Sequence, residues 1–193
     1  MTSREKILAA VKKSQPPAPP STPTRLDGAL PVEAKTQFKE IVKAIGGSVI
    51  EIENTGQIAG HVGQKFPAEA SILCSVPGAG IGTPPNDGVV FEKLNLVILR
   101  ANFAVAENGA VWITDRLLPD RVLPFICEHL ALVIDASDIV PTLTEAYEII
   151  GSDQYHFGTF IAGPSKTADI EQSLVLGAHG PKSLTVFMLA EKN

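Results

Sequence analysis

Thiols are scarce in this chain, which limits the metal and redox chemistry it can perform alone. Only two cysteines, Cys74 and Cys127, occur among 193 residues. A common iron–sulfur cluster takes four thiolate ligands, so no such cluster is expected in this chain. The two thiols could pair in principle, but a reduced pair in a cytoplasmic protein is the favoured interpretation. The four histidines show no HxxxH or HxxE spacing, so no metal site built by the protein is expected either.

Clusters of positive charge and long apolar runs are also missing. The 16 lysines and arginines are outnumbered by 21 acidic residues and form no basic stripe, which argues against binding to nucleic acid. No apolar run approaches the roughly 18 residues of a membrane span. The N-terminal MTSREKIL lacks the apolar core and cleavage site of a secretory signal. Apolar residues, at 45%, are abundant enough for the core of one domain, so we expect a globular cytoplasmic protein.

A proline-rich segment divides the chain. Before it, Thr2 and Glu5 fit a capping box and an apolar face follows, which predicts a helix over 1–13. The segment SQPPAPPSTPT opens a predicted linker over 14–30, because proline removes backbone donors and favours extended chain. Residues 31–193 then form the predicted domain. The N-terminal helix either packs on a partner or second subunit, or docks on its own domain.

Within that domain, apolar strands alternate with amphipathic helices. Strands are predicted at 48–52, 71–75, 94–100, 109–114, 130–135, 157–162 and 184–189, with helices near 38–45, 55–64 and 142–150. Continuous apolar strands of this kind are typical of a sheet buried on both faces. The predicted class is therefore α/β, with a mostly parallel central sheet flanked by helices.

A glycine-rich stretch, PGAGIGTPPNDG, follows the second predicted strand. It reads GxGxG instead of the dinucleotide-binding GxGxxG, and Pro84-Pro85 stand where a helix would have to begin. We therefore expect a surface loop, or a lid beside a site, and no dinucleotide fold at this point.

The segment AVAENGAVWIT allows two interpretations. Asn108 and Gly109 adopt positive φ at low cost, so the segment fits a tight hairpin turn with a solvated Glu107. Alternatively, Glu107 lies at the end of a strand, where α/β sheets place their ligands. Glu107 is then a candidate catalytic residue, with Asn108 and Gly109 as candidate ligand-binding residues.

The segment GPSKTADIEQSLVLGAHGP follows another predicted strand and concentrates polar side chains and glycines. Ser165 or Thr167 can cap a short helix whose free N–H groups would suit an anion. The carboxylates of Asp169 and Glu171 are two positions apart, so they project to the same side only if the segment is extended. A purely structural role stays open. The candidate ligand-binding residues here are Gly163, Ser165, Lys166, Thr167, Asp169, Glu171, His179 and Gly180.

That segment resembles the signature of the lactate-utilisation (LUD) domain family, particularly its C-type members. AENGAVWIT resembles the family's second marker, which more often has threonine at the position of Asn108. LALVID and TLTEAYEII also fall where the family has them, so the resemblance covers about 31–189. It implies the fold of ribose-5-phosphate isomerase, glucosamine-6-phosphate deaminase and family I CoA-transferases.

The resemblance also implies a function. C-type members belong to a three-component system that oxidises L-lactate to pyruvate, in which sister subunits carry iron–sulfur clusters. This chain would then be a subunit that is inactive alone, holds no cofactor, and binds a small anionic ligand or a nucleotide. Its expected partners are iron–sulfur subunits, with a homo-oligomer also conceivable.

Two other functions remain open. CoA-transferases of the related fold carry a nucleophilic glutamate in a Ser-Glu-Asn-Gly context, which AENG resembles. Glu107 could then serve a stand-alone acyl transferase or isomerase, with the loop at 78–82 as its oxyanion hole. The chain could instead be a non-catalytic assembly domain. If Glu107 and the GPSKTAD turn share a site, the strand ends before Glu107 and Gly163 lie together at one sheet edge and form the main pocket.

Overall fold

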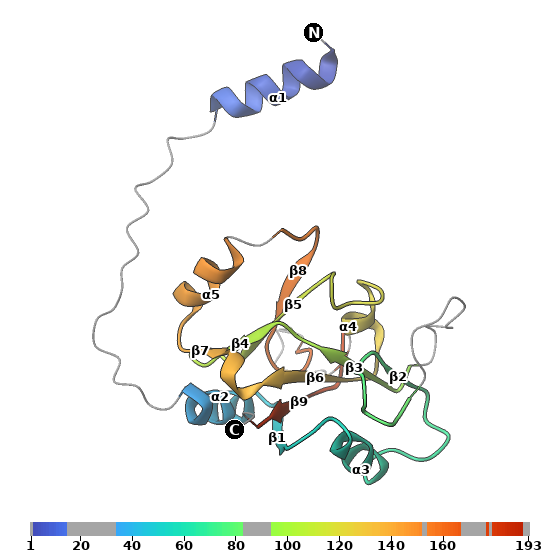
Figure 1. Cartoon of the computed structure of the whole chain (residues 1–193). Helices are drawn as coiled ribbons and strands as arrows, with labels where there is room; N and C mark the ends of the chain where they lie inside the picture. The colour runs from blue at the N-terminus through green and yellow to red at the C-terminus, as the bar shows by residue number, and fades with distance from the viewer. Residues whose placement is uncertain are drawn as a thin grey trace, which may run out of the picture.

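The centre of the molecule is a five-stranded parallel sheet (Figure 1). The structure is a computed structural model that describes residues 2–14, 34–82, 94–151, 154–166, 177 and 179–190. The strand order is β1-β9-β6-β3-β2, and every neighbouring pair is parallel. The strands are β1 (Ser48–Ile52), β2 (Ile72–Cys74), β3 (Leu96–Arg100), β6 (His129–Asp135) and β9 (Ser183–Leu189). The predicted class is confirmed.

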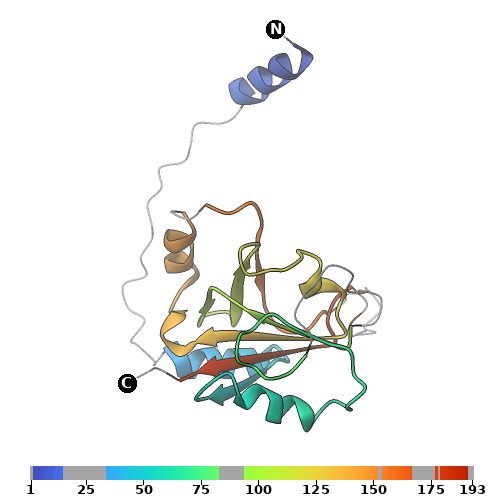
Figure 2. The same cartoon turned by 45° about the vertical axis from the view of Figure 1, so that its right-hand side comes forward.

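Both faces of this sheet are covered, which explains its continuous apolar strands. On β6, Leu130 and Leu132 join the larger core on one face, whereas Ala131 and Val133 join the smaller core on the other. The larger core includes residues of α2 (Ala34–Ala44) and of a second sheet; the smaller includes those of α3 (Gln57–Gly63). Figure 2 shows α3 and the second sheet on opposite sides of the parallel strands.

The second sheet was not predicted. Its order is β7-β4-β5-β8, from β4 (Phe103–Val105), β5 (Ala110–Thr114), β7 (Ile139–Val140) and β8 (Gly158–Ile161). Strand β4 escapes the sequence pattern because it has only three residues, all buried. It is fixed by tertiary contacts: Asn102 N–H donates to the Trp112 carbonyl (2.9 Å), and Asn102 Oδ1 accepts from Thr114 N–H (3.0 Å).

Three further helices complete the described chain. Helix α1 (Ser3–Ser14) begins with the predicted capping box, in which Thr2 N–H donates to Glu5 Oε2 (2.7 Å) and Glu5 N–H to Thr2 Oγ1 (3.3 Å). None of its residues is buried. Short α4 (Leu123–Ile126) precedes β6, and α5 (Leu143–Ile150) follows β7. Among the described residues, no helix is both long and apolar enough to cross a membrane.

Candidate functional site

Charged side chains lie where two central strands of the parallel sheet end. Arg100 is the last residue of β3, and Asp135 is the last residue of the neighbouring β6. The Arg100 guanidinium forms an ion pair with Asp135 Oδ2, and both side chains remain partly exposed, at 28% and 41%. In open α/β sheets, ligands bind in the crevice beyond the carboxyl ends of the strands. The carboxyl edge of the parallel sheet is therefore a candidate ligand-binding site.

Two loops come together near this edge. Strands β1 and β2 are the outermost strands, with three strands between them. The loops that follow them nevertheless meet, because Thr55 Oγ1 donates to the Pro77 carbonyl (3.0 Å). Gly78 has φ of +76°, and a Cβ at this position would lie 2.9 Å from Thr55 Oγ1. The glycine-rich loop thus needs its glycine to approach the loop after β1.

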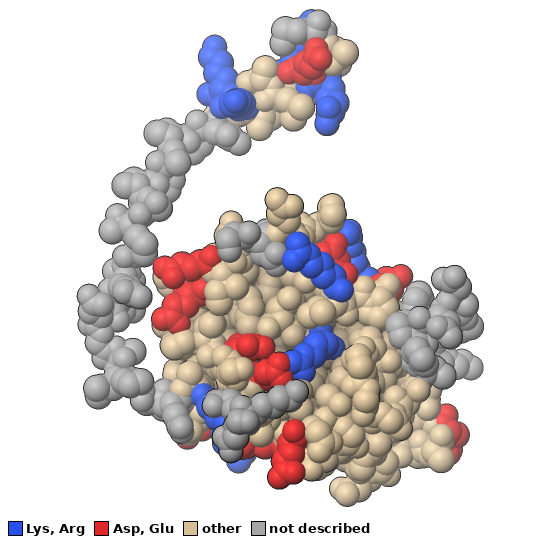
Figure 3. Space-filling view, viewed as in Figure 1, with Lys and Arg blue, Asp and Glu red and all other residues tan. Residues whose placement is uncertain are grey.

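The edge contains a pocket of about 680 Å³. Its lining combines the loop after β1, the ends of β3, β6 and β9, and the turn after β6: Glu53, Asn54, Thr55, Arg100, Asp135, Ser137, Leu189 and Ala190. We call it the carboxyl-edge pocket. Figure 3 shows acidic and basic side chains side by side near the end of β6. Among the described residues of this lining, Arg100 is the one basic residue.

A second carboxylate influences the same edge. Burial raises the pKa of Asp138 above its ordinary value, and the negative charge of Asp135 adds to the effect. Asp138 ends the 3₁₀ turn (Ala136–Asp138) that follows β6. Arg100 therefore offsets the repulsion between these two carboxylates, and its ion pair with Asp135 orients the guanidinium.

The arrangement suits recognition of a small polar molecule. A guanidinium has five N–H donors, so Arg100 can hold Asp135 and still present donors to a carboxylate or phosphate. Asn54, Thr55 and Ser137 add amide and hydroxyl groups that can bond hydroxyl or carbonyl oxygens. No group of three or more potential metal ligands was found among the residues that the structure describes.

The residues singled out from sequence lie elsewhere. Glu107 follows β4 in the second sheet, and its Oε2 accepts the Leu143 N–H (2.9 Å) at the start of α5. Asn108 Oδ1 accepts the Ala110 N–H (3.0 Å), as in a tight Asx-type turn. The hairpin interpretation describes this turn, and the Glu107 carboxylate acts there as a helix cap.

The strand ends before Glu107 and Gly163 lie at one sheet edge, as predicted, but none of the pockets described here is lined by Glu107 or Gly163. Gly109 and Gly163 lie close together at this edge. The register pairs Val105 with Ala110 and Val111 with Ile161, so β4 and β8 end at one edge with β5 between them. Both glycines have positive φ (+68° and +71°) and approach Ile45, just beyond α2. Gly109 and Gly163 therefore pack against the end of α2. Neither glycine lines a pocket described here.

The GPSKTAD segment meets the residues that precede β9. Ser165 N–H donates to the Pro181 carbonyl (2.9 Å), and Gly177 N–H donates to the Ser165 carbonyl (3.1 Å). A Cβ on Gly180 would lie 3.2 Å from Ser165 Cβ. His179, which is exposed, and Gly180, which is half-buried, line a hollow of about 750 Å³ at the amino-terminal edge of the parallel sheet.

Lys166 is exposed. Three other candidates, Thr167, Asp169 and Glu171, lie outside the described residues. The structure thus brings Ser165, Gly177 and Gly180 together, and does not bring Glu107 into the same hollow.

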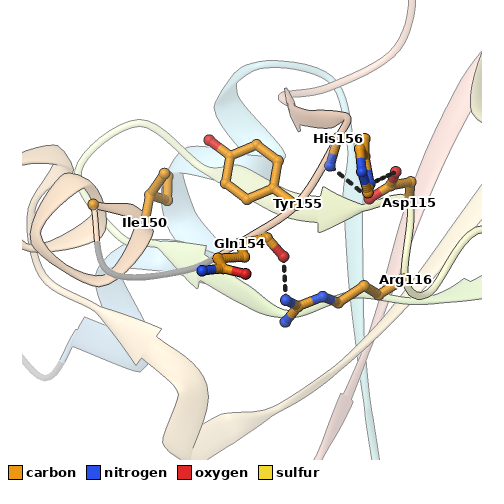
Figure 4. Close-up of a pocket in the computed structure, with 7 residues that line it drawn as sticks. Asp115, Arg116, Ile150, Gln154, Tyr155 and His156 are labelled. Carbon is orange, nitrogen blue, oxygen red and sulfur yellow. Dashed lines mark hydrogen bonds and ion pairs between the residues drawn. The ribbon is translucent and has the colours of Figure 1, made fainter.

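A further cleft, of about 800 Å³, lies between the end of β5 and the chain before β8 (Figure 4). Its charged groups already have partners within the protein. Asp115 pairs with Arg121 (2.8 Å) and approaches His156 Nδ1 (3.7 Å), while Arg116 donates to the Gln154 carbonyl. Desolvation raises the Asp115 pKa, but the His156 N–H and the Arg121 guanidinium outweigh it and hold that pKa below its ordinary value. These contacts indicate a structural role.

Sequence reasoning missed the carboxyl-edge pocket, although a signal was present. LNLVILR and LALVID were both predicted as strands, and each ends its apolar run in a charged residue. A charge at the carboxyl end of a buried parallel strand points to the ligand-binding edge. That signal identifies Arg100 and Asp135. Asn54, Thr55 and Ser137 lie in connecting turns and are placed only by the fold.

Comparisons with known proteins agree on one family. The sequence profile of the LUD domain matches residues 89–189. The chain is similar to lactate utilization protein C of Anoxybacillus flavithermus, at 33% identity over 83% of this chain and 71% of that protein. For lactate utilization protein C of Geobacillus thermodenitrificans, the identity is 27% over 89% and 72%.

A solved structure supports the fold. It is a DUF162 family protein from Deinococcus radiodurans, with a TM-score of 0.58, 16% identity, and coverage of 81% of this chain and 96% of that chain.

Proposed function

This chain belongs to the LUD domain family, and on that premise we propose that it is a component of an L-lactate utilisation system. The observation that carries the proposal is its similarity to lactate utilization protein C of Anoxybacillus flavithermus, 33% identical over 83% of this chain. The similarity extends over 71% of that relative, so it involves most of both proteins.

The chemistry of the thiols supports a division of labour in such a system. Oxidation of L-lactate to pyruvate releases two electrons, which iron–sulfur partner subunits would accept. Cys74 and Cys127 are both free and buried. Burial raises the pKa of Cys127 to about 12 and also raises that of Cys74, and a thiol that stays protonated is a poor metal ligand. Cluster ligands would therefore come from other chains.

The carboxyl-edge pocket is the proposed ligand site of this component. Arg100 would bind the anionic group of a small ligand, and Asp135 would hold the guanidinium in place. Asn54, Thr55 and Ser137 would contact its hydroxyl or carbonyl oxygens. The family resemblance predicts a small anion or nucleotide, and both carry groups that a guanidinium binds.

A deletion strain of the native host tests both levels of the proposal. Loss of the gene should abolish growth on L-lactate and leave growth on glucose intact. Wild-type protein and an Arg121→Lys control should restore growth, because Arg121 pairs with Asp115 away from the pocket. Arg100→Lys, which keeps the charge and loses the planar fork, should restore it poorly at equal protein level.

The outcomes separate the two claims. Normal growth of the deletion strain on L-lactate would refute the role in lactate utilisation. Full rescue by Arg100→Lys and by Arg100→Ala would leave that role standing and refute the ligand site. Co-purification from the native cell with mass spectrometry would identify iron–sulfur partners, which this proposal requires.

A stand-alone enzyme that uses Glu107 has less support. A nucleophilic carboxylate needs access to its substrate, and the Glu107 carboxylate accepts a helix N–H instead. The glycine-rich loop, which would have supplied its oxyanion hole, contacts Thr55. An assembly domain without a ligand is the outcome that full rescue by both Arg100 variants would favour.

A further inference from the structure

A small hollow lies beneath α3, on the face of the parallel sheet that carries the smaller core. Its volume is about 250 Å³, which corresponds to roughly eight water molecules. It is formed at the beginnings of β1, β6 and β9, at the opposite end of these strands from the carboxyl-edge pocket. It is therefore a separate site, independent of the proposed function.

Its polar lining consists of hydroxyl and nitrogen groups. Ser48, Ser183 and Thr185 come from the strands, His129 begins β6, and His61 and Lys65 come from α3 and the residues after it. The lining as described contains no carboxylate. A half-open hollow with one ammonium, two imidazoles, three hydroxyls and no acid favours an anion.

Hydrogen bonds within the lining leave donors available. Ser48 Oγ and Thr185 Oγ1 are 3.1 Å apart, so one hydroxyl donates to the other and the acceptor keeps its own proton. His129 Nδ1 lies 2.7 Å from Ser183 Oγ. If Nδ1 accepts, the ring carries its proton on Nε2; if it donates, the Ser183 proton is free. Either tautomer leaves a donor.

The charged residues near the hollow do not cancel its preference for an anion. The closest acid in sequence, Glu128, is engaged by Lys182 Nζ (2.6 Å) and by Asn95 Nδ2 (3.1 Å). Burial lowers the pKa of His129; the Glu128 charge opposes that shift and the Lys182 charge adds to it. Burial therefore favours the neutral form of His129, and an anion beside it would favour its protonated form.

Two aromatic rings give the hollow fixed walls. Phe66 packs edge-on against the His129 ring, with 5.3 Å between the ring centroids, and Phe187 lies 6.0 Å from the His61 ring. These contacts hold both imidazoles in place without using their nitrogens. The two imidazoles are therefore held in position around the hollow, which reduces the entropy lost on binding.

We propose that this hollow binds a small oxyanion, the carboxylate or tetrahedral oxyanion group of a small molecule, through Lys65, His61, the Ser48–Thr185 hydroxyl pair and the His129–Ser183 pair, each pair supplying one donor. Its size limits the ligand to a few heavy atoms beyond that group. The carboxylate and the tetrahedral anion share the same recognition chemistry, and titration separates them.

The four histidines of the chain make the test specific. Acetate, L-lactate and sodium sulfate are titrated separately into the full-length protein at constant ionic strength, and imidazole signals are followed by NMR. His61 and His129 should shift saturably with at least one probe, with a Kd in the millimolar range or below. His156 and His179 line other hollows and serve as internal controls. Saturating probe should also raise the pKa of His129.

Variants then assign the contacts. Lys65→Met and Thr185→Val should each weaken binding about five- to tenfold, since each removes a donor to a charged group. Lys43→Met is the matched control, because Lys43 is exposed on α2, which packs on the other face of the sheet. It should leave the affinity unchanged. Melting curves show that each variant is folded.

Three results would overturn the proposal. Absence of a saturable shift at His61 and His129 with all three probes would show that nothing binds. Equal shifts at all four histidines, or affinities unaffected by Lys65→Met and Thr185→Val in folded protein, would show only a general effect of anions. Failure here would leave the role in lactate utilisation untouched, because that role is read from growth.

Discussion

Glu107 illustrates how a side chain with a nucleophile's local sequence can be committed to structure. Its Oε2 accepts the Leu143 N–H at 2.9 Å, which satisfies one of the free donors at the start of α5. Thr142 Oγ1 accepts the Glu145 N–H (3.3 Å) at the same helix end. The carboxylate also carries negative charge where the helix dipole is positive. The helix therefore has two caps, one local and one from the hairpin.

Removal of the Glu107 cap should destabilise the protein. We expect Glu107→Ala to lower the free energy of unfolding by about 0.5–2 kcal/mol, and the melting midpoint by roughly 1–8 °C. Glu148→Ala, on the exposed part of the same helix, is the control and should change the midpoint little. A native midpoint for Glu107→Ala together with failed growth on L-lactate would instead assign Glu107 to the chemistry.

Asp138 should make the protein less stable as its carboxyl ionises. Burial raises the folded-state pKa of Asp138, so its contribution is fully favourable below the unfolded pKa and is lost as the pH rises through the folded pKa. Asp138→Asn removes this titration. The midpoint of the variant relative to wild type should therefore be higher at about pH 7 than at about pH 3. An equal difference at both pH values would contradict the burial argument.

For single residues, the sequence readily identified those that stand out among their sequence neighbours. It did not identify those that the fold places at the ligand-binding edge of the sheet. Glu107, Gly109 and Gly163 stand out locally, and the structure gives each a conformational task in capping or close packing. Arg100 and Asp135 look ordinary in sequence. They become neighbours only because β3 and β6 pair in parallel, a contact between residues 35 positions apart.

Two glycines show how the same substitution can have opposite effects in different elements. Gly109 has φ of +68°, and an added Cβ would lie 3.1–3.2 Å from side chains of α2. Gly60 lies inside α3, where an added Cβ would meet nothing within 4 Å. The hairpin therefore requires its glycine, whereas the helix does not.

Gly109→Ala should lower the free energy of unfolding by at least about 1 kcal/mol, because alanine resists positive φ. Gly60→Ala should raise it by about 0.4–1 kcal/mol, because alanine loses less backbone entropy in a helix. Urea denaturation of both variants measures the two changes. A loss of stability in Gly60→Ala would mean that the α3 backbone is not helical as described.

The elements themselves were largely predictable. All five strands of the parallel sheet fall on the predicted apolar strand segments, and helices α2, α3 and α5 fall on the predicted helical segments. Strand β4 did not, because three buried residues are too few to display a period and its pairing depends on Asn102. Short elements of this kind are fixed by the partner strand, which the local sequence does not contain.

At the scale of the whole molecule, the parallel sheet separates two polar sites at the opposite ends of its strands. The carboxyl-edge pocket has Arg100 among carboxylates, whereas the hollow under α3 has Lys65 and two histidines with no acid in its lining. The apolar middle of each strand holds the ends in register. A substitution in one polar site should therefore leave binding at the other unchanged unless it unfolds the sheet.

Helix α1 contributes no buried residue to the cores around the two sheets. Its apolar side chains are exposed, with Ile7 at 63%, Leu8 at 53% and Val11 at 53%, and the helix has no buried residue. A helix that buries nothing contributes little to the stability of the domain, since most helical stability in proteins comes from packing an apolar face. We therefore expect deletion of residues 1–14 to leave the melting midpoint of the remaining chain unchanged within roughly 1 °C.

The same deletion distinguishes the two roles that the sequence left open for this helix. A midpoint lowered by several degrees would show that α1 docks on its own domain, against the exposure of its apolar face. With a native midpoint, growth of the complemented deletion strain on L-lactate becomes the deciding measurement. Failed growth, reproduced by the triple variant Ile7→Ser, Leu8→Ser and Val11→Ser, would assign the apolar face to a contact with another chain. Such a contact would bury the three side chains that the isolated chain leaves in water.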